Sequence, residues 1–370
     1  MSEGKRVVIC GGGAIGAAIA YFLSRRGARP IVVERHEVAG AASGKSGGFL
    51  ALDWCRGNPL DGLARRSFAL HAELAEELGN PWGYRRLTTF AGHAAEAAVS
   101  RPSSKRSWLA GGVVLTEEIG SPETTALVEP HAFTNGLMRA AEAQGAELRH
   151  GAVSGLVRDR SGAVRGTTLS TGETVESEAV VIAMGPWSLL AAGWLPLPAV
   201  FGYKGHSLVL DTGTAIPAEA LFLEYREAGG ETLSPEVFPR ADGTTWVCAI
   251  SSTDALPIDP ADVSPDDGAF ARLEAMCRSL SPVLGSAPVL RRQACFRPLT
   301  QDGLPLMGAV PGVDGAYVAT GHNVWGILNA PASGEAMSEL VLDGGSRHVD
   351  LAPFAPGRLR PLDPKRLRNS

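Results

Sequence analysis

The chain has 370 residues, of which 45% are hydrophobic and 20% charged, and its formal net charge is −5. This length predicts two domains, and the composition is that of a soluble globular enzyme. The net negative charge argues against a general nucleic-acid binder. The five cysteines show no CxxC or Cys/His ligand spacing, which indicates a reducing compartment and argues against a structural zinc site.

No signal peptide is expected, because a predicted strand begins within the first ten residues. The sequence therefore predicts a cytoplasmic protein, or one of a reducing organelle matrix if a transit peptide was removed. The uncharged stretch 179–203 is interrupted by several glycines and prolines. A strand followed by a loop fits this stretch better than a membrane helix does.

Residues 6–34 predict a strand, a loop, a helix and a second strand. The apolar run Val7 to Cys10 is followed by Gly11, Gly13 and Gly16, which complete a GxGxxG pattern. The first glycine permits a tight turn, the second lets a pyrophosphate approach the backbone, and the third allows the helix to pack closely on the strand. The start of the helix would offer free N–H groups to the phosphates.

The second strand ends at Glu34, where a carboxylate can accept hydrogen bonds from ribose hydroxyls and would repel the phosphate of NADP. The loop alone leaves FAD and NAD open. The small-residue run from Ala39 to Gly48 would let a flat ring system lie against backbone, and the apolar residues 49–52 make a flexible surface loop a poorer interpretation.

The rest of the chain predicts further elements in order. Asn58 and Pro59 resemble the cap and first turn of a helix that runs to Leu78. A helix and a strand follow over 130–150, then two short strands, then a buried strand from residue 179 that ends at a turn. Residues 203–292 alternate strand-like segments with loops, with one helix capped by Ser264 and Pro265. The last glycine-bounded strand, "YVATG", leads into a helix over 327–342.

Five segments carry a family resemblance: "GGGAIGAAIAYFLSRRG" with "VVER", "SGKSGGFLA", "AVVIAMGPWS", "CFRPLTQDGLPLMG" and "GHNVWGILNAPASG". In this order they resemble the D-amino-acid oxidase superfamily of FAD proteins, which includes glycine oxidase and monomeric sarcosine oxidase. The resemblance covers essentially the whole chain. The segment from Gly47 to His71 looks closer to a subgroup whose substrates are poorly defined.

The resemblance implies an α/β fold. A discontinuous Rossmann-like FAD-binding domain would take residues 1–84, 128–202 and 293–370. An α+β substrate domain on a mainly antiparallel sheet would take residues 85–127 and 203–292. The FAD contacts implied, with Val153 near the adenine and Gly185 near the phosphates, are Gly11, Gly13, Ala14, Ile15, Gly16, Glu34, Arg35, Ala42, Ser43, Ser46, Gly47, Gly48, Leu50, Val153, Ala183, Gly185, Trp187, Gly321, Gly326 and Ile327.

The resemblance also suggests site residues. Arg297 matches the arginine that binds the substrate carboxylate in glycine and D-amino-acid oxidases, and a guanidinium can hold a carboxylate through two hydrogen bonds. Lys204 would supply positive charge near the flavin, and His206 and His322 would touch substrate or flavin; a solvated lysine and structurally paired histidines are the alternatives.

Two positions bear on the substrate and on the flavin attachment. Glycine oxidase carries a further arginine where this chain has Val324, followed by Trp325, so glycine is in doubt and a larger or more apolar substrate is suggested. Cys295 matches the cysteine that attaches the flavin in monomeric sarcosine oxidase, but the neighbouring "FRPLT" agrees better with non-covalent FAD.

The function expected is FAD-dependent oxidation of the C–N bond of an amino acid or N-alkyl amino acid, by hydride transfer to flavin N5, with O2 as acceptor and H2O2 as product. The alternatives are a flavin dehydrogenase that passes electrons to another carrier, and a flavoprotein with a role in assembly or trafficking. The partners expected are a small amine or amino acid and an electron acceptor, with no nucleic acid and no integral membrane segment. The oligomeric state is open.

Overall fold

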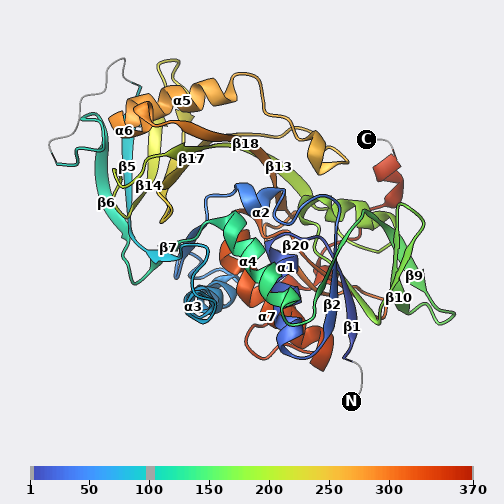
Figure 1. Cartoon of the computed structure of the whole chain (residues 1–370). Coiled ribbons are helices and arrows are strands. Elements are labelled where there is room, and N and C mark those ends of the chain that lie inside the picture. The colour runs from blue at the N-terminus through green and yellow to red at the C-terminus, as the bar shows by residue number, and fades with distance from the viewer. Residues whose placement is uncertain (1–3, 97–104, 369–370) are drawn as a thin grey trace.

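The computed structural model describes residues 4–96 and 105–368. Within these residues, a six-stranded sheet forms the centre of the lower half of the molecule in Figure 1. All of its neighbouring strands are parallel except for the edge pair β19 and β20. Across the sheet the strands are β19 (Leu306–Ala309), β20 (Ala316–Thr320), β12 (Ala179–Ile182), β1 (Arg6–Cys10), β2 (Arg29–Glu34) and β8 (Glu147–His150).

Both faces of this sheet are covered, which explains why its central strands are apolar throughout. Four helices pack together with one face (Figure 1), and a three-stranded sheet packs with the other. The helices are α1 (Ala14–Arg25), α3 (Asp61–Glu77), α4 (Pro130–Glu142) and α7 (Gly326–Asp343). The three strands are β9 (Val153–Arg158), β10 (Val164–Leu169) and β11 (Thr174–Glu176). This arrangement confirms the Rossmann-like layer.

The upper half of the molecule in Figure 1 is built on a second, strongly curved sheet. Its strands pair antiparallel except for β14 and β5, as the sequence predicted for the second domain. In order they are β18 (Val289–Leu299), β13 (Phe201–Asp211), β17 (Thr244–Ser252), β16 (Glu236–Pro239), β14 (Glu219–Arg226), β5 (Thr88–Ala95) and β6 (Val114–Gly120), with β15 (Thr232–Leu233) beside β14.

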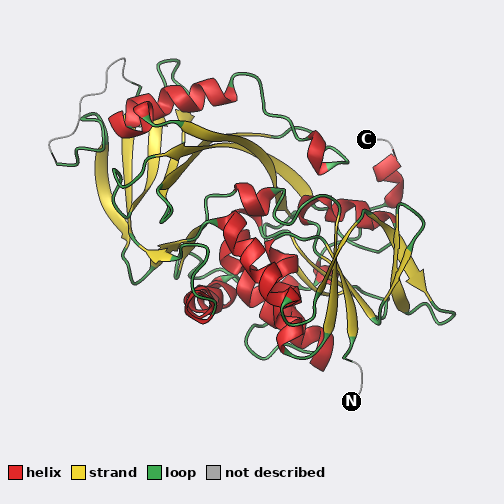
Figure 2. Ribbon diagram, in the orientation of Figure 1, coloured by secondary structure: helices red, strands yellow, loops and turns green. Residues whose placement is uncertain are grey.

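The outer face of the curved sheet packs under α5 (Ala269–Leu280) and α6 (Pro282–Ser286), and its inner face turns toward the parallel sheet (Figure 2).

A small antiparallel sheet lies near the junction of the two halves. Its strands are β3 (Phe49–Ala51), β7 (Thr125–Leu127) and β4 (Arg85–Arg86). Short helices complete the described chain: α2 (Ala42–Lys45), η1 (Gly185–Gly193), η2 (Pro260–Asp262), η3 (Asn323–Trp325), η4 (Ala352–Phe354), η5 (Pro356–Arg358) and η6 (Pro364–Arg368).

Two helix starts differ from the sequence prediction. Helix α3 begins at Asp61, because Asn58 forms a turn in which its side chain accepts from the Leu60 N–H at 3.0 Å. Helix α5 begins at Ala269 and follows Gly268, which has a left-handed φ of +72°. The predicted cap at Ser264 is therefore wrong: a left-handed residue interrupts the chain between that serine and the helix.

The domain limits remain a prediction, but they can be compared with the residues that form the two large sheets. Residues 88–95, 114–120 and 201–299 supply the curved sheet. Strand β18 belongs to this sheet up to Leu299, so a limit at residue 293 falls inside a strand. Residues 97–104 of the predicted substrate domain lie outside the described part of the chain. In the described residues, no helix combines the length and the apolar character needed to cross a membrane.

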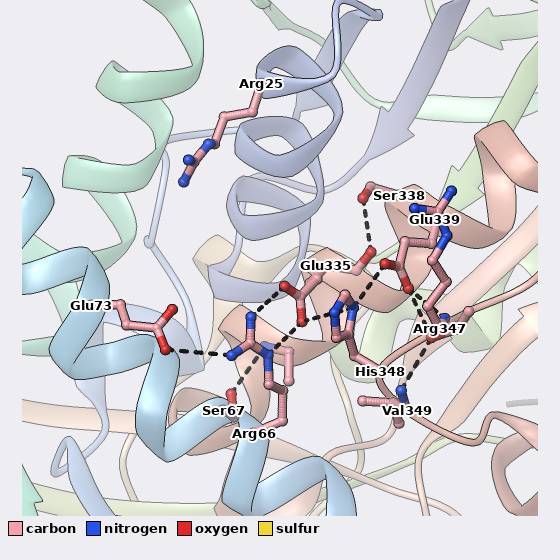
Figure 3. A network of polar contacts seen from close by, with 12 residues as sticks. Arg25, Arg66, Ser67, Glu73, Glu335, Ser338, Glu339, Arg347, His348 and Val349 are labelled. Atoms are coloured by element: carbon pink, nitrogen blue, oxygen red, sulfur yellow. Dashed lines mark hydrogen bonds and ion pairs between the residues drawn. The ribbon is translucent and has the colours of Figure 1, made fainter.

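A charged network fixes the last long helix against its neighbours (Figure 3). The guanidinium of Arg66 on α3 donates to both carboxylate oxygens of Glu335 on α7, at 2.8 and 2.7 Å. One turn along α7, the Glu339 carboxylate accepts from the Arg347 N–H at 2.7 Å and contacts the His348 ring at 2.9 Å. The network joins α3, α7 and the segment after α7, and so fixes the C-terminal half of α7.

Candidate active site

The glycine loop after β1 has the close contacts that its sequence predicted. Gly11 has a left-handed φ of +110°, and a Cβ there would lie 2.5 Å from the Ala183 carbonyl oxygen. A Cβ on Gly16 would lie 2.0 Å from the carbonyl oxygen of Gly11. Both distances are far too short for a side chain, so the loop, the first helix and β12 approach each other only because these positions are glycine.

The acid at the end of β2 is held beside this loop. The Glu34 carboxylate accepts from the Gly12 N–H at 2.7 Å and from the His36 N–H at 3.0 Å. The Ser43 hydroxyl accepts from the Ala14 N–H at 2.8 Å. The residue before α1, Gly13, adds no side-chain cap, and the positive end of the helix lies at the loop.

A cavity of about 750 Å³ extends from this loop to the inner face of the curved sheet. The residues that the sequence assigned to FAD and that line it are Gly11, Gly13, Ala14, Ile15, Glu34, Arg35, Ala42, Ser43, Ser46, Gly47, Gly48, Val153, Ala183, Gly185, Trp187, Gly321, Gly326 and Ile327. Gly16 and Leu50 do not line it. Gly16 packs against the loop behind it, and Leu50 is fully buried in the core on β3.

The second glycine-rich junction forms the other end of the same cavity. After β20, Gly321 turns the chain with a φ of +79°, and α7 starts at Gly326 with no side-chain cap. The Thr320 hydroxyl donates to the Gly185 carbonyl oxygen at 2.8 Å and ties this junction to the loop after β12. The N-termini of two helices, roughly 300 residues apart in the chain, therefore open into one cavity.

His322 lies in the wall of this junction and is buried. Its Nε2 contacts the Ser333 hydroxyl at 3.0 Å, and its Nδ1 has no protein partner. Burial lowers the pKa of His322 to about 3. The ring is therefore neutral at ordinary pH and supplies no positive charge, and its free nitrogen is left for a bound molecule.

These groups fit the FAD that the resemblance implies. Glu34 stands where a ribose can be held, and the N-termini of α1 and α7 line the cavity and can offer N–H groups to anionic or electron-rich parts of a dinucleotide. Among the described residues, Ser46 and His322 line the cavity, and the buried Ser46 hydroxyl and His322 Nδ1 have no protein partner. A buried polar atom without a partner is costly, so both residues fit a cavity that binds a ligand with polar groups.

The wall formed by the curved sheet carries the polar groups that a substrate would meet. Cys295 and Arg297 of β18, Gly205 of β13, and Cys248 and Glu236 on the next two strands all line the cavity. The Arg297 guanidinium donates through Nη2 to the Ser251 hydroxyl at 2.9 Å and lies 5.4 Å from the centre of the Tyr203 ring.

The Arg297 side chain lies against Gly205. A Cβ added to this glycine would lie 3.0 Å from Arg297 Nη2. Gly205 thus provides the space in which the arginine lies against the strand.

Cys295 lies in the same wall, and burial raises the pKa of its thiol. A sulfur with a raised pKa is protonated at neutral pH and is a poor nucleophile. A protonated thiol is what the predicted non-covalent flavin would leave at this position.

An aromatic wall completes the cavity, formed by Phe49, Trp54, Phe222, Phe238, Trp246 and Trp325. The Phe238 ring stacks on Trp246 at 5.4 Å and on Phe49 at 5.2 Å between centroids. Trp54 contacts the Trp325 ring edge-on at 6.3 Å. These rings come from two different sheets, from the turn after β3 and from the turn before α7, so the wall forms only in the folded chain.

Lys204 is placed differently from its predicted role. It does not line the cavity; alternation along β13 puts its side chain on the opposite face from Gly205. Its buried ammonium is paired with Asp254 and Asp266 and donates to the Ser264 carbonyl oxygen at 3.3 Å. These contacts anchor both ends of the loop 253–267.

The loop 253–267 also contacts residues of the predicted FAD-binding domain. The Trp187 indole N–H donates to the Pro257 carbonyl oxygen at 2.8 Å, and Arg35 donates to that of Ile258 at 3.0 Å. His206, beside Lys204, contacts the same loop: its Nε2 accepts from the Asp266 N–H at 3.0 Å. Pro260 and Val263 of the loop line the cavity, so the loop covers part of it.

The sequence reasoning did not single out three polar residues that line the cavity, namely Glu236, Cys248 and Lys45. One signal was available for Glu236, since it is an isolated acid in the apolar strand "EVFP" of β16. Lys45 occurs inside the segment "SGKSGG" that carried the resemblance.

The comparisons with known proteins agree with this geometry. Residues 6–340 match the DAO family model, described as FAD dependent oxidoreductase. A putative oxidoreductase of Schizosaccharomyces pombe is 29% identical, over 95% of this chain and 98% of its own length. Glycine oxidase of Pseudomonas aeruginosa is 29% identical, over 97% of this chain and all of its own length.

A solved structure gives the same result. The crystal structure of glycine oxidase from Geobacillus kaustophilus superimposes with a TM-score of 0.79 at 26% identity, covering 95% of this chain and 98% of that one. The predicted fold, a Rossmann-like FAD layer with a substrate domain, is thereby confirmed. Since the family model spans most of the chain, this protein belongs to the DAO family of FAD-dependent oxidoreductases, and its cofactor is FAD.

Proposed function

We propose that this oxidoreductase removes a hydride from the carbon beside the nitrogen of an amino acid or N-alkyl amino acid. The observation that carries the proposal is the position of Arg297. Arg297 lies in the wall of the cavity, and the glycine loop and the start of α7 line the same cavity. A guanidinium in such a position is suited to a carboxylate. Glycine oxidases among the relatives support the same reaction class.

The cavity walls favour a substrate larger than glycine. Val324, which stands where the resemblance to glycine oxidase implies an arginine, lines the cavity and is 53% exposed. Trp325 follows it in the chain, and Trp54 contacts the Trp325 ring and extends the aromatic wall. Together these residues offer an apolar surface, so an amino acid with an apolar or N-alkyl substituent fits better than one without a side chain.

The residues of the chain would divide the work as follows. Bound FAD supplies an acceptor for the hydride at N5. Arg297 would fix the carboxylate and so orient the substrate carbon, which is the main requirement for such a transfer. The N–H groups at the start of α7 would stabilise negative charge that develops nearby. The aromatic wall would exclude water from the site.

We further propose that O2 takes the electrons, which gives an imine or oxo acid and H2O2. The experiment is an anaerobic screen of amino acids and N-methyl amino acids for bleaching of the flavin absorbance, followed by admission of air. Bleaching by a carboxylated amine with fast recovery in air supports the oxidase. Bleaching without recovery would mean a dehydrogenase. No bleaching by any amine, with a co-purifying protein, would favour an assembly or trafficking role instead.

A further inference from the structure

Glu236 lines the same cavity as Arg297, from another strand of the curved sheet. In the sheet register, Glu236 lies opposite Cys248, Cys248 opposite Ser207, and Ser207 opposite Gln293. Directly opposed residues share a face of a sheet, and so do residues two apart on one strand. Arg297 is therefore on the face that Glu236 shares, with two strands between them, and both residues line the cavity.

The carboxyl of Glu236 makes no ion pair with any cation of the described residues. Cys248 Sγ donates to its Oε2 at 3.6 Å. The titratable groups that face it are Cys248 on β17 and Arg297 on β18; β14, on its other side, places Phe222 opposite. Burial raises the pKa of Glu236, and the Arg297 charge opposes this effect without cancelling it.

The proposed reaction needs a group of this kind. An amine with a pKa of about 8–10 enters from neutral water as an ammonium ion. Hydride leaves the adjacent carbon only when the nitrogen has a free electron pair, so the substrate must lose a proton inside the cavity. His322, which is neutral and buried, and Cys248, whose pKa burial raises well above its usual value, are poorly suited to take part at neutral pH.

We propose that Glu236 is the proton acceptor for the substrate ammonium group, an inference that rests on the proposed function. One N–H bond of the ammonium breaks, its electron pair stays on nitrogen, and an O–H bond forms on the Glu236 carboxylate. The amine is then neutral when hydride leaves for the flavin. The carboxyl returns its proton to solvent after the imine product has left. Arg297 holds the carboxylate and Glu236 faces the nitrogen.

The test is the pH dependence of flavin reduction in Glu236→Gln, measured by anaerobic stopped-flow with the best substrate of the screen. The amide preserves shape but accepts no proton, so the variant depends on the neutral fraction of the free amine, which at pH 7 is about one part in 10 to one in 10³ for an amine pKa of about 8–10. We expect a fall of about that size at pH 7. The fall should shrink about tenfold per pH unit and vanish near the pKa of the free amine, because the variant then binds amine that is already neutral.

The matched control is Glu224→Gln on β14, which carries the same chemical change at an exposed position and should follow the wild-type profile. Glu236→Asp keeps a carboxylate and should retain part of the rate at pH 7, with its FAD content checked by absorbance. It also serves if Glu236→Gln fails to fold.

The possible results distinguish a failure of the Glu236 proposal from a failure of the proposed oxidation of amines. If no amine bleaches the wild-type flavin, both fall. If amines bleach it but Glu236→Gln reduces equally fast at pH 7, or is slower by one constant factor at every pH, Glu236 is not the acceptor while the oxidation of amines stands. A loss confined to substrates with a second, distal cation would also overturn the inference.

Discussion

The replacement of Arg297 by lysine is the most direct test of the proposed substrate orientation. The change keeps one positive charge in the cavity wall. It therefore preserves most of the charge by which Arg297 opposes the burial that raises the pKa of Glu236. What it removes is the planar fork. In the structure one end of that fork, Nη2, is held by Ser251 at 2.9 Å, beside the space left by Gly205. The remaining N–H groups are left for the substrate.

The expected magnitude follows from the contact that is lost. A charge-assisted hydrogen bond of this kind is worth about 1.5–3 kcal/mol. Since about 1.4 kcal/mol corresponds to a factor of ten, Arg297→Lys should lower the second-order rate constant of flavin reduction roughly 10- to 150-fold. Arg297→Ala should be worse, because the substrate carboxylate would then be buried without a partner.

The assay is anaerobic stopped-flow reduction, with FAD content measured first, so that neither reoxidation nor loss of cofactor enters the rate. The comparison substrate is the corresponding amine without a carboxylate, which should be nearly indifferent to the change. An equal loss for both substrates would show that Arg297 is structural, through its contacts with Ser251 and Tyr203. No loss for either would show that the carboxylate is bound elsewhere.

Three further predictions follow from packing and burial. Gly16→Val should abolish FAD binding, seen as a colourless protein, because its side chain would meet the Gly11 carbonyl oxygen; full flavin content would remove the loop from the binding site. Acid precipitation should release the flavin into the supernatant, because burial keeps the Cys295 thiol protonated, and colour in the pellet would contradict this. The third concerns His71, whose pKa burial lowers to about 4. The unfolded chain binds a proton on it near pH 6.5, so stability should fall between pH 6.5 and 4, by about 3 kcal/mol in all. A His71→Leu variant should lack that part of the slope in thermal unfolding curves, and an unchanged slope would count against the burial argument.

The glycine loop and the start of α7 could be predicted because each is a local pattern. Within a dozen residues, the spacing of glycines after an apolar run specifies a strand, a turn and a helix. The observed contacts of Gly11 and Gly16 are those the pattern requires. The end of β2 at Glu34 was equally readable, because the acid ends an apolar strand at the expected distance from the loop.

The residues of the curved sheet that line the cavity were harder to predict, because the register between strands brings them together. Glu236 and Arg297 are separated in the sequence and meet only through two intervening strands. The prediction for Lys204 depended on which face of β13 it occupies, and a shift of one residue exchanges the two faces. The structure puts Gly205 toward the cavity and Lys204 toward Asp254 and Asp266. Pattern alone could not settle that choice.

The cavity is assembled from both ends of the chain, and this has a consequence for biosynthesis. The glycine loop is made first, and the start of α7 follows roughly 300 residues later, which at about 5–20 residues per second is on the order of 15–60 s of translation. During that interval the nascent chain contains the glycine loop but not the start of α7, and the aromatic wall still lacks Trp325. Flavin should therefore enter only near the end of synthesis, and prematurely terminated chains in a preparation should be colourless.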